Sequence, residues 1–192
     1  MPVFVGLGNP GNAYAGHRHN VGFMALDLLA ERHGFAPWRA KFQGQLSEGH
    51  LGVAKVLLLK PLTYMNESGR AVGEALRFYK LEPRDVIVFH DELDLVPFKC
   101  RVKQGGGVAG HNGLRSIAAH LGTQDFKRVR LGIGHPGDRN RVTNYVLGNF
   151  AKAEIPDLAR FLDAVVDAAP KLAQDDDAGF MNRVALLMQD DA

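Results

Sequence analysis

Short apolar runs alternate with amphipathic segments along this chain, and this alternation restricts the fold more than any other feature. The apolar runs are too short for helices and predict buried strands over about 3–7, 53–59, 86–89 and 129–133, with a further strand over about 99–103. Apolar residues recur at helical spacing over about 21–33, 66–79 and 114–121. Strands that alternate with helices indicate an α/β fold with a largely parallel sheet.

Two residues at the ends of the first predicted helix carry capping signals. Asn20 precedes it as a candidate N-cap, and Gly34 follows it as a candidate stop signal. Gly122 ends the helix over 114–121 in the same way. The acidic C-terminal part, from about residue 154 to 189, predicts two further helices, broken near residues 175–179.

A length of 192 residues fits a single domain, which we expect to span residues 1–192 and to include the C-terminal helices. The single cysteine, Cys100, cannot form an internal disulfide and suits a reducing compartment. No apolar run approaches the ~20 residues that cross a bilayer. The first eight residues lack the features of a signal peptide. We therefore expect a cytoplasmic protein with no membrane partner.

Charge is unevenly distributed, although the net charge is only +2. Residues 99–141 carry nine Lys and Arg against two Asp, whereas residues 142–192 carry four basic against nine acidic residues. One stretch therefore holds the positive excess, which is typical either of a polyanion-binding surface or of a solvated basic face.

Polar side chains follow three of the predicted strands. Asn9 follows the first, Asn66 the second and Asp91 the third. In α/β folds ligands bind outside the carboxyl ends of parallel strands. We therefore expect these three residues to meet at one edge of the sheet.

His19 is the candidate general base. It lies just before a predicted helix, whose positive N-terminal end favours neutral imidazole, the form that accepts a proton. Asp91 at the same edge would orient the ring and stabilise its charged form. No nucleophile motif is present, so a water molecule activated by His19 is the simplest nucleophile. A metal site built from residues 17–19 and 90–92 is the less favoured alternative, because the spacing H-x-H is unspecific.

Two glycine-rich segments differ in what they predict. Residues 6–11 (GLGNPG) match the dinucleotide fingerprint, but Pro10 removes a backbone donor and a long loop separates them from the helix, so we exclude a nicotinamide or flavin cofactor. Residues 104–113 (QGGGVAGHNG) run directly into a helix. Such a loop, with Arg101 and Lys103 before it, is typical of an anion-binding site, and the alternative is a flexible surface loop.

Six ordered blocks over residues 5–137, with YVLG at 145–148, make the chain resemble the bacterial-type peptidyl-tRNA hydrolases. The blocks are VGLGNPG (5–11), Tyr14 with RHNVG (18–22), KPLTYMN (60–66), HDELDL (90–95), KQGGGVAGHNGL (103–114) and RLGIGHPG (130–137). Order and coverage make this far more specific than any single motif.

The resemblance implies an esterase that releases the peptide from the 3′ end of tRNA in peptidyl-tRNA that leaves the ribosome early. It implies a mixed sheet surrounded by helices, a monomer, no metal and no other cofactor. His19 would be the base, and Asp91 would stabilise its basic form. Asn9 would discriminate N-blocked from free aminoacyl groups. The implied contacts to substrate or tRNA are Tyr14, Tyr64, Asn66, Arg101, Lys103, His111, Asn112 and Arg130.

The sequence departs from the family pattern at two places. His17 replaces the usual Thr before RHN and puts a second imidazole near His19, and residues 96–98 read VPF where the family has PPG. A non-catalytic RNA-binding protein on the same fold is the alternative function. Such a protein would need the basic stretch but not the set Asn9, His19, Asn66 and Asp91.

Overall fold

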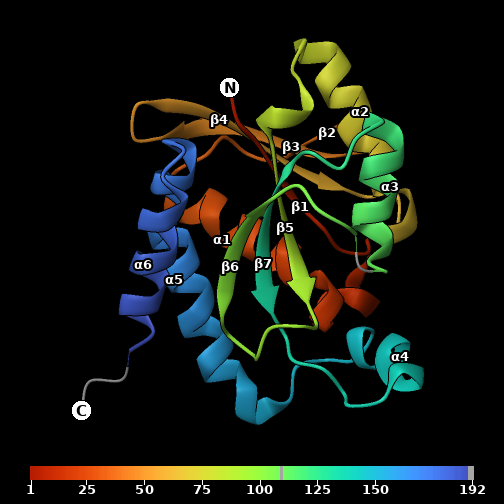
Figure 1. The fold of residues 1–192 in the computed structure, drawn as a ribbon. Helices are drawn as coiled ribbons and strands as arrows, with labels where there is room; N and C mark the ends of the chain where they lie inside the picture. Colours follow the sequence, from red (N-terminus) through yellow and green to blue (C-terminus); the bar gives the residue numbers. More distant parts are fainter. Residues whose placement is uncertain (109, 190–192) are drawn as a thin grey trace.

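A seven-stranded sheet forms the centre of the computed structural model, which describes residues 1–108 and 110–189 (Figure 1). Residues 190–192 of the expected domain lie outside this part. The strands are β1 Val3–Gly6, β2 Arg39–Lys41, β3 Gly44–Leu51, β4 Ala54–Pro61, β5 Val86–Glu92, β6 Cys100–Gln104 and β7 Lys127–Gly132. Their order is β2-β3-β4-β1-β5-β7-β6.

The sheet is mixed, as expected. Strands β4, β1, β5 and β7 run parallel at its centre, and they are the four strands that the apolar runs predict. Antiparallel strands flank them: β3 and β2 on one side, and β6 on the other. The carboxyl ends of the four parallel strands therefore lie at one edge, which we call the catalytic edge of the sheet.

The hairpin of β2 and β3 was not predicted. Its two-residue turn consists of Phe42 and Gln43, which both have positive φ angles, 55° and 54°. A turn of this geometry strongly favours Asn-Gly, so the sequence carries no turn signal here. Strand β3 is also polar at most positions, because only Leu46 and Leu51 supply large buried apolar side chains.

Helices cover both faces of the sheet (Figure 1). Helices α1 (Val21–Arg32), α5 (Ile155–Ala173) and α6 (Asp177–Leu187) pack on one face, where Phe4, Ile87 and Val129 point. Helices α2 (Ser68–Tyr79) and α3 (Asn112–Leu121) pack on the other face, over Val3, Val5 and further strand residues. The short α4 (Val142–Val146) lies beside the catalytic edge.

The described residues also form short 3-10 turns, two of which shape the site. These are Asn12–Tyr14, Arg18–Asn20, Met65–Glu67, Pro83–Asp85, Arg139–Arg141 and Lys152–Glu154. Arg18–Asn20 leads directly into α1, and Met65–Glu67 leads into α2.

Gly22 permits α1 to approach the strand ends. A Cβ at Gly22 would lie 2.3 Å from the carbonyl oxygen of Phe89, and a Cβ at Gly6 would lie 2.6 Å from the carbonyl oxygen of Gly22. Neither position tolerates a side chain at these distances. This contact brings the start of α1, with His19 just before it, to the end of β5.

The two glycines predicted to end helices do so, whereas the Asn20 side chain does not act as a cap. Gly34 follows the end of α1 with φ 65°, and Gly122 follows α3 with φ 71°. Asn20 occupies the N-cap position of α1, as predicted, but its side chain makes no capping hydrogen bond and bonds to the backbone of Asn9 instead. Within the described residues, no helix has the length and apolarity to cross a membrane.

Phe98 takes the place where the family pattern has glycine. Its φ of 66° is the left-handed conformation that glycine adopts readily. Its ring packs against Phe161, with centroids 5.9 Å apart, and against Phe150. Packing of this half-buried ring against the two phenylalanines offsets the backbone strain.

Candidate active site

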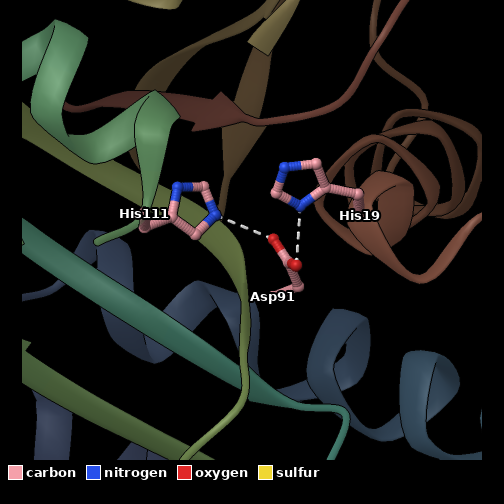
Figure 2. Close-up of side chains that lie close together, drawn as sticks. All are labelled: His19, Asp91 and His111. Atoms are coloured by element: carbon pink, nitrogen blue, oxygen red, sulfur yellow. Dashed lines mark hydrogen bonds and ion pairs between the residues drawn. The ribbon is translucent and has the colours of Figure 1, made fainter. Parts of the chain in front are cut away.

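Three side chains from distant parts of the sequence meet at the catalytic edge (Figure 2). Asp91, near the end of β5, accepts a hydrogen bond at Oδ2 from Nδ1 of His19 at 2.7 Å. Its Oδ1 accepts from Nε2 of His111 at 2.8 Å. Asp91 is buried, whereas the His19 and His111 side chains are 12% and 11% exposed. Both carboxylate oxygens are therefore occupied.

His111 fixes the proton positions of the whole triad. Its Nδ1 accepts the backbone N–H groups of Gly113 at 3.1 Å and Leu114 at 3.3 Å, so His111 is the N-cap of α3. A nitrogen that accepts cannot carry a proton, so the proton of this neutral ring is on Nε2 and is donated to Asp91. Asp91 in turn accepts the Nδ1 proton of His19, which leaves the lone pair of His19 on Nε2.

Electrostatics favour an ionised Asp91. Burial raises the pKa of Asp91, but the electrostatic attraction of the His19 and His111 rings and the hydrogen bonds from both rings outweigh burial and hold the pKa below its usual value. The carboxylate is therefore charged at neutral pH and can stabilise a positive charge on His19.

The pKa of His19 is raised, contrary to the sequence prediction that the helix end keeps the ring neutral. Burial lowers the pKa of His19. The charge of Asp91 and the hydrogen bond to it raise this pKa by more, so the net shift is upward. The Asp91 carboxylate, 2.7 Å from the ring, outweighs the partial positive charge at the N-terminus of α1.

Two further histidines lie near this cluster. The His90 ring packs edge-on against that of His111, with centroids 5.1 Å apart. His90 is buried and donates from Nδ1 to the backbone oxygen of Asp91 at 2.9 Å. Burial, followed by the electrostatic effect of His111, lowers the pKa of His90 to about 4, so this ring is neutral. The His17 ring packs edge-on against Tyr14, with centroids 5.4 Å apart, and its backbone pairs with Asn149.

One group of ligand atoms has the spacing of a metal site. Atoms of His19, Asp91 and His111 lie within 4.8 Å of one another. This set differs from the residues 17–19 and 90–92 that the sequence offered. In the tautomers above, the ring nitrogens that face Asp91 carry protons, so they are hydrogen-bond donors and not lone-pair ligands.

Asn9 is held in place by three hydrogen bonds beside this triad. Its N–H donates to Oδ1 of Asn20 at 2.9 Å, and its carbonyl accepts from Nδ2 of Asn20 at 2.9 Å. Its own Oδ1 accepts the N–H of Met65 at 2.7 Å. No described residue accepts from the Nδ2 of Asn9, so this amide is free to donate to a ligand.

Asn66 and the two predicted tyrosines border the same edge. Asn66 follows Met65 in its 3-10 turn and is exposed. The rings of Tyr14 and Tyr64 meet edge to face with centroids 6.2 Å apart, although 50 residues separate them. Asn112, the first residue of α3, is exposed and its Oδ1 accepts from Arg115 at 3.5 Å.

The basic stretch is only partly available to a ligand. Arg101 and Lys103 are exposed on the edge strand β6. Arg130 is engaged, because its Nε donates to Glu92 at 2.8 Å. Lys127 is buried between Asp175 and Asp177 of the acidic C-terminal part, and Arg128 is buried beneath the glycine-rich loop. Lys127 and Arg128 belong to the basic stretch but are therefore not exposed to a phosphate.

Two residues of the site carry roles that the sequence did not indicate. His111 appeared only as a tRNA contact, and Asn20 only as a helix cap. The signal for His111 was its place three residues before Leu114 at a helix start, where a side-chain acceptor is needed. Nothing in the sequence pairs Asn20 with Asn9.

The fold and the triad define an α/β protein with a histidine oriented by a buried aspartate, which is the arrangement of general-base enzymes. Residues 3–191 match the family model described as peptidyl-tRNA hydrolase. The chain therefore belongs to the peptidyl-tRNA hydrolase family.

Individual relatives agree over nearly the whole length. The chain is 62% identical to the peptidyl-tRNA hydrolase of Zymomonas mobilis, with 98% of this chain and 100% of the relative covered. It is 65% identical to that of Novosphingobium aromaticivorans, with 98% of each covered. The crystal structure of the peptidyl-tRNA hydrolase from Acinetobacter baumannii superposes with a TM-score of 0.89 at 39% identity, over 96% of this chain and 94% of that one.

Proposed function

We propose that this protein hydrolyses the ester that joins a peptide, or an N-blocked amino acid, to the 3′ end of tRNA. The observation that carries the proposal is the 2.7 Å hydrogen bond from His19 to the buried Asp91, in a chain of this family. Peptidyl-tRNA released early from the ribosome is the expected substrate, and its hydrolysis returns free tRNA to translation.

In the proposed mechanism His19 activates water. Its Nε2 takes a proton from a water molecule, whose oxygen attacks the ester carbonyl carbon. The tetrahedral intermediate then collapses, and the C–O bond to the tRNA breaks. The leaving 3′ oxygen takes the proton from the imidazolium. Asp91 stabilises that imidazolium, and His111 holds the other carboxylate oxygen so that the acceptor stays aimed at His19.

Asn9 and Asn66 bind the peptide in this proposal. The free Nδ2 of Asn9 donates to a carbonyl oxygen of an N-blocked substrate, beside His19 at the catalytic edge. Asn66 is exposed next to Met65, the residue that holds Asn9, and so reaches the same substrate. Tyr14, Tyr64 and Asn112 border this region and would contact the 3′ end of the tRNA.

Lys103 and Arg101 are proposed to contact tRNA phosphates on the other side of the site. Both are exposed on β6. Arg130 joins them only if it leaves Glu92. We further propose that the chain acts as one domain and as a monomer in the cytoplasm, without a metal or other cofactor, as its resemblance to the family implies.

Release of N-acetyl-amino acid from N-acetyl-aminoacyl-tRNA tests the proposal. Wild-type protein should release it catalytically, and the His19→Ala variant should bind the same RNA with little turnover. An RNA-binding protein without activity is the alternative, and it would bind the substrate and leave the ester intact in both cases.

A further inference from the structure

Arg128 on β7 is a cation buried without a carboxylate partner. Its side chain is 2% exposed, and none of the ion pairs among the described residues involves it. The guanidinium donates instead to three backbone carbonyls: Gly107 at 2.7 Å, Gly106 at 2.8 Å and Gln124 at 2.8 Å. Its face lies over the Phe126 ring at 4.5 Å. Two of its partners belong to the glycine-rich loop.

These bonds fix the orientation of two consecutive peptide groups. A trans peptide places its N–H opposite to its C=O. Because the carbonyls of Gly106 and Gly107 point inward to Arg128, the N–H groups of Gly107 and Val108 point away from it. Neither N–H donates to another described residue, and Gly106 and Gly107 are exposed. Successive backbone N–H groups that face outward form an anion-binding concavity.

Lys103 reaches the same loop from the neighbouring strand. Lys103 and Arg128 are directly opposite in the β6–β7 ladder. A Cβ at Gly106 would lie 2.6 Å from Cε and 2.7 Å from Nζ of Lys103, so the lysine side chain lies against Gly106. Gly106 has φ 94° and no side chain, which leaves room for the lysine. Arg128 and Lys103 therefore both lie against Gly106 and concentrate positive charge at this part of the loop.

We propose that Arg128 is a positioning residue that orients the backbone N–H groups of Gly107 and Val108 as an anion site, where they bind one RNA phosphate together with Lys103. The inference deepens the proposed function by naming the part of the loop that holds the tRNA. Arg128 itself touches no phosphate. It acts through the loop carbonyls, and its charge adds to the potential at the site.

Nuclear magnetic resonance of 15N-labelled protein tests the site directly. Inorganic phosphate and an RNA hairpin with an acceptor stem should both shift the amide signals of Gly107 and Val108 in the wild type, with the hairpin active at far lower concentration. The Arg128→Met variant should lose both responses. Unmoved amides in the wild type would overturn the proposal, and a response to phosphate without one to the hairpin would overturn its RNA part.

Kinetics separate positioning from a purely structural role. We expect Arg128→Met to raise KM for N-acetyl-aminoacyl-tRNA about tenfold, the effect of losing one well-placed charged contact, with kcat within about twofold. The slope of log K against log salt should fall by up to about one.

Arg128→Lys should rescue part of the affinity, because it keeps the charge and can bond to some of the carbonyls. In a Lys103→Ala background the Arg128→Met effect should shrink. Lower kcat with unchanged KM and salt slope would overturn the proposal.

A second variant pair leaves Arg128 in place. Gly107→Pro removes one of the two N–H groups, whereas Gly107→Ala keeps it, and a Cβ at Gly107 meets nothing within 4 Å. Only the proline variant should weaken hairpin binding, with thermal unfolding as the control for folding. RNA binding equal to wild type in both Arg128→Met and Gly107→Pro would overturn the proposal. A wild-type protein that binds the hairpin but hydrolyses no ester would refute the proposed function and leave this inference standing.

Discussion

The side-chain amide of Asn20 binds both backbone groups of Asn9. The Asn9 N–H donates to Oδ1 of Asn20, and the Asn9 carbonyl oxygen accepts from Nδ2 of Asn20, each at 2.9 Å. The pair is buried, with Asn9 8% and Asn20 2% exposed. The Met65 N–H already donates to Oδ1 of Asn9, whereas no described residue accepts from Nδ2, so Nδ2 is the group available to a substrate. Asn9 is therefore a rigidly mounted donor.

A rigid donor predicts selectivity for N-blocked substrates. A peptide offers a carbonyl to Nδ2, whereas the free amino group of aminoacyl-tRNA offers none and leaves a buried donor unpaired. Sites of this kind discriminate by up to about 10⁴–10⁵-fold. Asn9→Ala should lower kcat/KM for N-acetyl-aminoacyl-tRNA far more than for aminoacyl-tRNA, and the ratio of the two values measures this. If Asn9→Ala left this ratio unchanged, Asn66 and not Asn9 would be the residue that discriminates between the two substrates.

His19 should dominate the chemical step. General-base catalysis contributes about 10²–10⁴-fold, so His19→Ala should reduce kcat by that factor while the Kd for tRNA stays close to wild type. His17→Ala is the matched control, because its ring packs on Tyr14 and has no contact with Asp91. A large loss in His17→Ala instead would identify the other imidazole as the base.

The pH dependence should follow His19. Its neutral form is the base and its pKa is raised above 6.5, so kcat/KM should rise with pH through a midpoint above that value. In Asp91→Asn the carboxylate charge is gone and burial remains, which lowers the pKa of His19. The midpoint should therefore move to lower pH, and the plateau should fall by less than in His19→Ala. A midpoint unmoved by Asp91→Asn would show that another group titrates.

Chelation should leave activity unchanged. The ring nitrogens that face Asp91 donate protons to it and are not free to coordinate an ion. Assay with and without EDTA measures this. A loss that added zinc or manganese restores would instead establish a metal among His19, Asp91 and His111.

Lys103 should act on the tRNA and not on the ester. Lys103→Ala should weaken binding of a tRNA substrate and lower the salt slope of log K by about one. Hydrolysis of a minimal ester without the tRNA body should stay within about twofold. Arg130→Ala is the comparison, because Arg130 is engaged with Glu92 and should change the slope less. Equal losses on both substrates would place Lys103 in the chemistry.

The four central strands and five of the helices could be predicted from the sequence. Their apolar residues recur with the period of the element, and Gly34 and Gly122 supply the backbone freedom that ends α1 and α3. The β2–β3 hairpin could not be predicted, because Phe42 and Gln43 adopt a turn that their residue types do not favour. Packing of that turn against α2, where Phe42 meets Phe78 and Tyr79, offsets the cost.

At the site, the sequence by itself indicated the candidate residues and the edge of the sheet that they share. The positions of Asn9, Asn66 and Asp91 after successive strands predict one shared edge, since parallel strands end together. Only the tertiary structure decided the state and partner of each group. The pKa of His19 is raised because burial and a carboxylate at 2.7 Å act on it together, and both depend on how β5 and the start of α1 pack. The same holds for the basic stretch of residues 99–141. The sequence gives the number of its charges, but the packing of the fold decides which of them a ligand can reach. Arg128 is buried, Arg130 is paired with Glu92, and Lys103 is exposed.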